Sequence, residues 1–266
     1  MAPRLSIMKP LSLLLFCAAL NLRADVAATL VRLPGASLDA SLQNEADHAL
    51  SQATLWLDAQ QHPDGSWGES NRVRLTSIAL FSLKGSRQPS HAEACARAAL
   101  WLGGSVSNRI DDLGTHAWRL LAIAIMLPEE PSRTNLLRRL ADQGEALETG
   151  ASAGARTFWR EALAAAGLGR PPPPDGDVSS RLTQAAAAWP PSLSDNAGAW
   201  RLARLINRAG NGQLLCGDAP LDWRTDLARH LINTQRRAPA GGFWKAPTSD
   251  GQIEETALGI LVLLEL

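Results

Sequence analysis

The stretch that decides the fold is LDAQQHPDGSWG at residues 57–68, followed by TSIALFSL at 76–83. A second version lies near the end of the chain, as LINTQ at 231–235, GGFW at 241–244 and TALGIL at 256–261. Both versions run from an amphipathic helix through Gln, a glycine turn and Trp to Thr and an apolar helix. A unit that returns in this way predicts a repeat architecture.

From Ser41 onward the whole chain is helical in pattern. Runs rich in Ala, Leu, Arg, Glu and Gln are separated by Gly, Pro and Asn clusters, and no alternating run is long enough for a sheet. The pattern predicts helices in pairs, at 41–60 with 74–84, 90–102 with 112–127, 132–148 with 153–167, 178–189 with 194–209, and 222–235 with 253–266.

The helices of a pair differ in character. The segment 41–60 is amphipathic, whereas 74–84 and 112–127 are apolar over most of their surface and must be buried on every side. Comparable leucines recur at the spacing of one helical hairpin, at Leu57, Leu102, Leu140, Leu182 and Leu231. We therefore expect an all-α fold, an α/α toroid of about five to six helical hairpins with inner apolar and outer amphipathic helices.

The N-terminus has the layout of a signal peptide. Arg4 and Lys9 precede an apolar run at 11–20, and small residues follow, with Ala19 and Ala24 as cleavage points. The run is shorter than the roughly 20 residues of a membrane span, although an uncleaved anchor stays an alternative. We expect export to the periplasm or the exterior, with no stable membrane span after cleavage.

The domain organisation follows from these segments. Residues 1–24 are the expected signal peptide, 25–40 a lead-in segment and 41–266 the toroid domain. Consecutive prolines make 170–177 a stiff surface loop between hairpins, because four of them cannot be helical.

Charge and cysteine content narrow the function classes. The 266 residues carry 26 basic and 26 acidic side chains, which argues against a general nucleic-acid binder. Signal cleavage removes Cys17 and leaves Cys95 and Cys216, which form either a disulfide or two buried thiols. We favour the thiols, because a domain of this size does not need the crosslink.

The recurring unit resembles the Gln–Trp repeats of squalene and terpenoid cyclases. Its residues here are Gln60, Asp64, Gly65 and Trp67 in the first copy, and Gln235, Gly242 and Trp244 in the second. That superfamily includes prenyltransferase β-subunits and thioester domains, and the resemblance implies an α/α toroid. In physical terms, Gln bonds a helix end, glycine makes the tight turn, and Trp packs over the joint with its N–H aimed at a carbonyl.

Three chemistries of that superfamily lack their motif in this chain. The nearest match to the cyclase Asp-x-Asp-Asp acid is RIDD at 109–112, without the first Asp, and LCGD at 215–218 lacks the thioester Glu-Gln. Cys216, Asp218 and His230 have the wrong order for the prenyltransferase zinc site. No metal and no cofactor is expected.

One constellation remains, at the end of the ring where the N-termini of the inner helices would gather. It consists of Arg72, Arg74, Asp111, Asp112, His116, Asp195, Glu254 and Glu255. Asp111, Asp112 and His116 are the catalytic candidates, because Asp112 and His116 share a helix face as an acid–base pair. Arg74, Asp195, Glu254 and Glu255 are the ligand-binding candidates. The competing interpretation is that these acids cap their helices.

The sequence therefore leaves two function classes open. The first is a non-catalytic exported toroid that binds a peptide, a protein or a lipid. The alternative is an enzyme at the ring mouth that acts on an isoprenoid or other lipid, or on a polysaccharide as a lyase or glycosidase. An apolar lumen favours lipid, a lumen of Trp, Arg and carboxylates favours glycan, and a filled lumen favours a scaffold.

Overall fold

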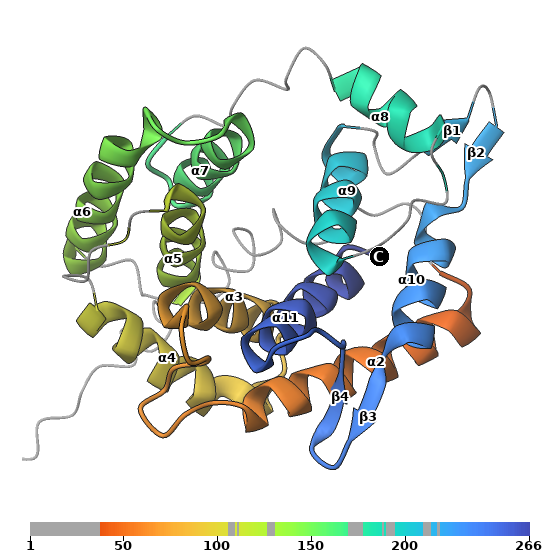
Figure 1. Ribbon diagram of the computed structural model, residues 1–266, viewed down its shortest axis with the longest axis horizontal. Helices are drawn as coiled ribbons and strands as arrows, with labels where there is room; N and C mark the ends of the chain where they lie inside the picture. The colour runs from red at the N-terminus through yellow and green to blue at the C-terminus, as the bar shows by residue number, and fades with distance from the viewer. Residues whose placement is uncertain are drawn as a thin grey trace, which may run out of the picture.

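The computed structural model describes residues 38–105, 110, 112–126, 131–169, 178–187, 189, 195–209, 214–216 and 219–266, and this part of the chain is mostly helical (Figure 1). The helices are α2 (Ala40–Ala59), α3 (Arg72–Gly85), α4 (Ala92–Gly104), α5 (Leu113–Met126), α6 (Pro131–Glu148), α7 (Ala153–Ala165), α8 (Val178–Ala187), α9 (Asn196–Ala209), α10 (Trp223–Thr234) and α11 (Ser249–Glu265), with a 3-10 turn η1 (Pro89–His91) before α4.

Every predicted helix is present, and most ends agree closely. The largest difference is at α11, which begins at Ser249 rather than at residue 253. The Thr248 side chain accepts a hydrogen bond from the Gly251 N–H, at 3.0 Å. This N-cap fixes the start of the helix one turn before its apolar run.

The absence of any sheet is not confirmed, because two short antiparallel hairpins are present. Strand β1 (Leu214–Cys216) pairs with β2 (Ala219–Leu221), and β3 (Arg236–Ala238) pairs with β4 (Gly241–Phe243). Each strand has three residues, so these hairpins act as turns between helices rather than as a sheet layer.

The helices form two layers. Helices α7, α5, α3, α11 and α9 pack side by side in that order, and the others lie outside them (Figure 1). Among the outer helices, α6 covers α5 and α7, α4 covers α3 and α5, and α2 covers α3 and α11. Helix α10 packs on α2 and α11, and α8 packs on α9.

The predicted contrast between apolar and amphipathic helices holds for part of the inner layer. Helices α3, α5 and α11 are buried around most of their circumference. Helices α7 and α9 are instead amphipathic, with Arg160 and Arg201 exposed. Among the described residues, no helix combines the length and the apolar character that a membrane crossing requires.

Aromatic rings from four helices of the inner layer contact one another. Trp118 of α5 stacks on Trp200 of α9 at 4.9 Å between ring centroids, and both contact Phe158 of α7 edge-on. Phe81 of α3 adds a further edge contact to Trp118. Glu161 of α7 also forms an ion pair of 3.0 Å with the guanidinium of the α9 residue Arg204.

The two sequence repeats place their tryptophans in equivalent surroundings. The Trp67 indole N–H donates to the Leu57 carbonyl at 2.7 Å, and its backbone N–H donates to Thr76 Oγ1 at 2.9 Å. In the second copy, the Trp244 indole N–H donates to the Leu231 carbonyl at 3.1 Å. Its backbone N–H donates to Thr256 Oγ1 at 3.2 Å. The predicted structural role of both tryptophans therefore has direct hydrogen-bond support.

Each repeat also docks on the outer helix beside it, and we call these two contacts the first and second seams. At the first seam, between the turn after α2 and helix α4, Gln61 Nε2 donates to the Ala94 carbonyl at 2.8 Å. At the second seam, between α10 with its hairpin and helix α2, Gln235 Nε2 donates to the Ala49 carbonyl at 2.8 Å. The first and last hairpins of the chain are thus neighbours.

A glycine makes each docking contact possible. At Gly65, with φ of +91°, an added Cβ would lie 2.7 Å from the Arg97 carbonyl carbon. At Gly241, with φ of +142°, it would lie 2.4 Å from the Gln52 carbonyl oxygen. Both the positive φ and the close backbone approach exclude a larger residue.

These contacts correct two residue assignments in the repeat. The counterpart of Gln235 is Gln61, not Gln60, and its amide bonds the adjacent helix rather than its own helix end. The counterpart of Gly65 is Gly241, whereas Gly242 lies under the Gln235 amide. The second turn falls at residues 239–240, between β3 and β4.

Several predicted features lie outside the described residues. These are the signal peptide 1–24, most of the lead-in segment 25–40 and the proline-rich loop 170–177. Cys95 is a free, buried thiol, and burial raises its pKa to about 11. The Cys216 side chain is not described.

Candidate functional site

The N-terminal ends of α3, α5 and α11 meet through residues of the constellation predicted from the sequence, which we call the mouth residues. Arg74, in the first turn of α3, forms an ion pair of 2.5 Å with Glu254 of α11. Asp112, at the start of α5, lies close enough to Arg74 for the positive charge of Arg74 to help lower the pKa of Asp112. Asp111 lies outside the described residues. Arg74, Asp112 and Glu254 therefore come together and link α3, α5 and α11.

Asp112 acts as a helix cap. Its carboxylate accepts hydrogen bonds from the Thr115 N–H at 2.8 Å, from the Thr115 hydroxyl at 2.7 Å and from the Gly114 N–H at 3.2 Å. Burial opposes ionisation, but these bonds and the charge of Arg74 hold the pKa of Asp112 below its usual value. A carboxylate held in this way is a poor general acid.

Glu255 and Asp195 perform the same task at α9. Glu255 accepts a hydrogen bond from the Asn196 N–H at 2.8 Å, and its backbone carbonyl accepts from the Asn196 side chain at 2.8 Å. Asp195 accepts from the Gly198 N–H at 2.5 Å. Burial raises the pKa of Glu255 despite the bond from Asn196, and the nearby Asp195 and Glu254 add to the rise.

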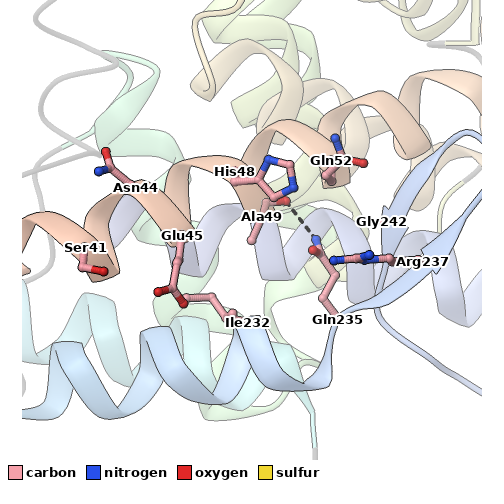
Figure 2. A pocket seen from close by; sticks show the side chains of 10 residues that line it. All are labelled: Ser41, Asn44, Glu45, His48, Ala49, Gln52, Ile232, Gln235, Arg237 and Gly242. Atoms are coloured by element: carbon pink, nitrogen blue, oxygen red, sulfur yellow. Dashed lines mark hydrogen bonds between the residues drawn. The ribbon is translucent and has the colours of Figure 1, made fainter.

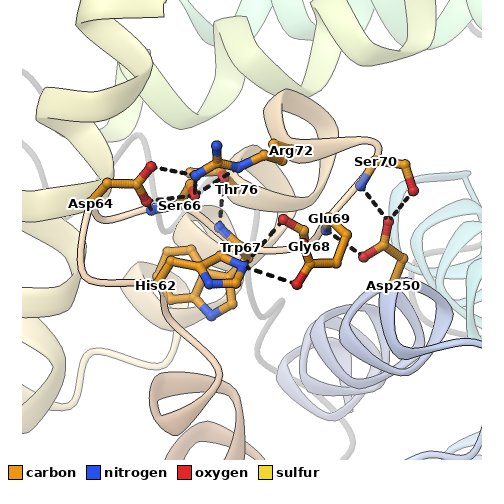
Figure 3. Close-up of polar contacts among 10 residues, drawn as sticks. All are labelled: His62, Asp64, Ser66, Trp67, Gly68, Glu69, Ser70, Arg72, Thr76 and Asp250. Atoms are coloured by element: carbon orange, nitrogen blue, oxygen red, sulfur yellow. Dashed lines mark hydrogen bonds and ion pairs between the residues drawn. The ribbon is translucent and has the colours of Figure 1, made fainter.

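Arg72 contacts the turn of the first repeat rather than the Arg74–Glu254 ion pair (Figure 3). It donates to Ser66 Oγ at 3.1 Å and pairs with Asp64, and its guanidinium lies 5.2 Å from the Trp101 ring centroid. Hydrogen bonds from Ser66, and the pairing with Arg72, lower the pKa of Asp64 to about 2.

A residue that the sequence reasoning missed, Asp250, ties the first repeat to the last (Figure 3). From the first turn of α11 its carboxylate accepts hydrogen bonds from the Glu69 N–H at 2.7 Å and the Ser70 N–H at 3.0 Å. It also accepts from the Ser70 hydroxyl at 2.7 Å. The loop before α3 is thereby fixed by a carboxylate from the other end of the chain.

His116 does not pair with Asp112. The imidazole is buried, 2 % exposed, and its ring contacts Trp159 edge-on at 6.5 Å between centroids. Its Nδ1 atom has no hydrogen-bond partner in the described part of the chain. Burial, with the charge of Arg119, lowers the pKa of His116. Asp112 and His116 stand four residues apart at the start of α5, but among the described residues no hydrogen bond of an acid–base pair joins their side chains.

A polar groove lies at the second seam, between α2 and the end of α10 (Figure 2). Its volume is about 480 Å³, which falls in the range of small-ligand pockets, roughly 300–1,000 Å³. The lining side chains are mostly polar and come from Ser41, Asn44, Glu45, His48, Ala49, Gln52, Ile232, Gln235, Arg237 and Gly242. No residue of this groove except Gln235 and Gly242 was singled out from the sequence.

A comparison with the first seam explains the groove. Ala49 and Gln52 on α2 occupy the places of Ala94 and Arg97 on α4, because the two glutamines and the two glycines contact these pairs in the same way. Arg97 Nε donates to Gln61 Oε1 at 3.0 Å and so fills the first seam. Gln52 is shorter, and Gln235 Oε1 has no partner among the described residues.

A second missing side chain widens the groove. At the first seam, buried His91 Nδ1 contacts Asp58 Oδ2 at 2.9 Å. By the same correspondence, Ala46 replaces His91 and Ile232 replaces Asp58 at the second seam. The second seam thus has the same backbone docking as the first but less side-chain volume across it, and open space follows.

The described residues contain no group of three or more His, Cys, Asp or Glu side chains that could hold a metal ion. Of the trio considered from the sequence, Asp218 and the Cys216 side chain lie outside the described part. His230 is half-buried on α10, and burial lowers its pKa.

No protein-family model, no curated protein and no solved structure matches this chain. Its function must therefore be inferred from the groove and the mouth themselves.

Proposed function

We propose that the protein is an exported, non-catalytic binding protein with an α/α toroid fold, related to the terpenoid cyclase and prenyltransferase toroids, and that it binds a polypeptide in the groove of the second seam. The toroid is supported by the repeated docking contact, which makes the first and last hairpins neighbours. Side-chain contacts between α7 and α9 support closure on the opposite side.

The state of the mouth residues favours binding over catalysis. Backbone N–H groups at helix N-termini donate hydrogen bonds to the carboxylates of Asp112, Asp195 and Glu255. Glu254 forms an ion pair with Arg74. Carboxylates that cap helices contribute to stability, and the lowered pKa of Asp112 makes it a poor general acid. The aromatic cluster around Trp118 joins α5, α7 and α9 by direct ring contacts, which disfavours an open apolar lumen for a lipid or isoprenoid.

The observation that carries the polypeptide assignment is the chemistry of the groove. Asn44, Gln52 and Gln235 place amide side chains along it, and an amide both donates and accepts hydrogen bonds. A polypeptide backbone offers one donor and one acceptor at each residue, which such a lining can satisfy. A lipid chain would leave these amides without partners.

Export and the absence of nucleic-acid binding are part of the same proposal. The basic n-region and the short apolar run at 11–20 support a signal peptide at 1–24. The balanced charge supports a partner other than nucleic acid.

A peptide-array screen with the full chain tests the proposal. The Gln52→Arg variant restores at the second seam the side chain that fills the first, and should weaken bound peptides by about ten-fold or more, which corresponds to about 1.4 kcal/mol. Gln60→Arg makes the same change just after the end of α2, outside the groove, and should leave binding unchanged. Binding that Gln52→Arg leaves intact, or an array with no bound peptide, contradicts the proposal.

A further inference from the structure

The groove of the second seam carries opposite charges from two different elements. Glu45 projects from α2, and Arg237 projects from β3 (Figure 2). Both side chains are exposed. Within the described part of the chain, neither side chain forms an ion pair or a hydrogen bond.

The two charges stand at different levels along the groove. Gly241 docks against the Gln52 carbonyl, and Gly242 beside it pairs with Arg237 across the hairpin. The Arg237 end of the groove therefore lies near Gln52. Glu45 lies seven residues earlier on α2, which at the rise of an α-helix is about 10 Å away.

The first seam handles its charges differently. There Glu93 and Arg97 lie on the same helix, α4, and pair with each other at 2.7 Å. At the second seam the position of Glu93 is taken by His48, and that of Arg97 by Gln52. At the second seam the acidic residue is instead Glu45 on α2, and the basic residue is Arg237 on β3. No pair equivalent to Glu93–Arg97 forms there, and both charged side chains line the groove.

We propose that the groove selects an extended peptide that carries a basic side chain for Glu45 and an acidic side chain for Arg237. Alternate side chains of an extended chain share a face, at about 6.6 Å for every second residue. The two charged residues of the peptide therefore lie two or four positions apart. This selectivity rests on the proposed function and assigns the chemical class of its ligand.

The test uses terminally blocked peptides of alanine and serine in which two positions, two or four residues apart, are varied. In the four sets these two positions carry Lys and Glu, two Lys, two Glu, or two Gln. The unmodified protein should prefer the Lys/Glu peptide at low ionic strength by about two- to five-fold for each matched charge. Glu45→Lys should shift the preference to the two-Glu peptide. Arg237→Glu should shift it to the two-Lys peptide. Fluorescence anisotropy gives the affinities.

The outcomes separate this inference from the proposed function. If the two-Gln peptide binds as tightly as the others, and if Gln52→Arg still blocks it, the charge selection is wrong and the peptide groove stands. If no peptide of any set binds, the proposed function fails as well. If the charge reversals change the preference in the expected reciprocal way, both are supported. Thermal unfolding of each variant confirms that the fold is retained.

Discussion

The two seams have the same backbone contact and opposite side-chain content. At each, a glutamine amide donates to an alanine carbonyl on the neighbouring outer helix, and a glycine approaches that helix closely. The first seam is then filled by Arg97 and His91, whereas the second leaves a groove. A repeat thus fixes how hairpins dock, and the few residues that differ between copies decide where a ligand fits.

The glycine contacts should give the largest effects if the seams are equivalent. Gly65→Ala and Gly241→Ala each place a methyl group against backbone at positive φ, and each should cost about 3 kcal/mol of unfolding free energy. Urea denaturation measures the loss. Ala substitution at Gly103, where an added Cβ meets nothing within 4 Å, is the control and should not destabilise. A mild effect at only one seam breaks the equivalence.

The indole hydrogen bonds come next. Trp67→Phe and Trp244→Phe both remove an N–H that a buried carbonyl accepts, and leave space beside it. Each should cost about 2 kcal/mol, with the two values similar. Thermal or urea unfolding measures both. Trp101, which is only half-buried, provides a matched Trp→Phe control with a smaller expected loss. Strongly unequal losses at residues 67 and 244 would separate the two repeats energetically.

Exchanging the seam side chains should interconvert the two sites. Arg97→Gln removes the guanidinium that fills the first seam and should cost no more than about 1 kcal/mol, because Arg97 is partly exposed. It should open a second groove, detectable as a second equivalent of bound peptide in calorimetric titration. If the stoichiometry stays at one in this variant, Arg97 is not what closes the first seam.

The smallest effect distinguishes the two turns by pH. Asp64 has a pKa of about 2 in the folded protein, below its ordinary 3.8. Its stabilisation is therefore full above pH 3.8 and is lost as the pH falls through about 2. The second turn has Ala240 at this position and no such carboxylate. Amide hydrogen exchange should show the first turn loosening earlier in acid, and Asp64→Asn should remove that difference.

Much of the fold could be predicted because helix patterns and the repeated unit are local signals. The correspondence of Trp67 and Trp244 as equivalent positions of the two repeats follows from the matched sequences alone. The choice between Gln60 and Gln61 does not, since both stand at the end of the same helix and only the position of α4 decides which amide reaches a carbonyl. Likewise the spacing of Asp112 and His116 predicts a shared face but not the direction in which the carboxylate turns.

The candidate site was the less predictable part. The mouth residues were singled out because they stand at helix starts, and in the structure most of them act as caps or bridges. The groove residues carry no local motif. The one signal available in the sequence is the alignment of α2 with α4 at an offset of 45 residues, in which Gln52 corresponds to Arg97. This alignment can be recognised only once the docking contacts of the structure fix its register.

The sequence by itself determined the helices, the recurrence of the glycine and tryptophan unit and the burial of α3, α5 and α11, because periodicity and turn chemistry act between neighbours in the chain. Only the tertiary structure decided which end of the molecule meets which, that carboxylates of one helix cap another, and that one seam is filled and the other open. Those outcomes depend on contacts between segments far apart in the chain, such as Gln235 with Ala49, which are 186 residues apart, and no local pattern encodes them.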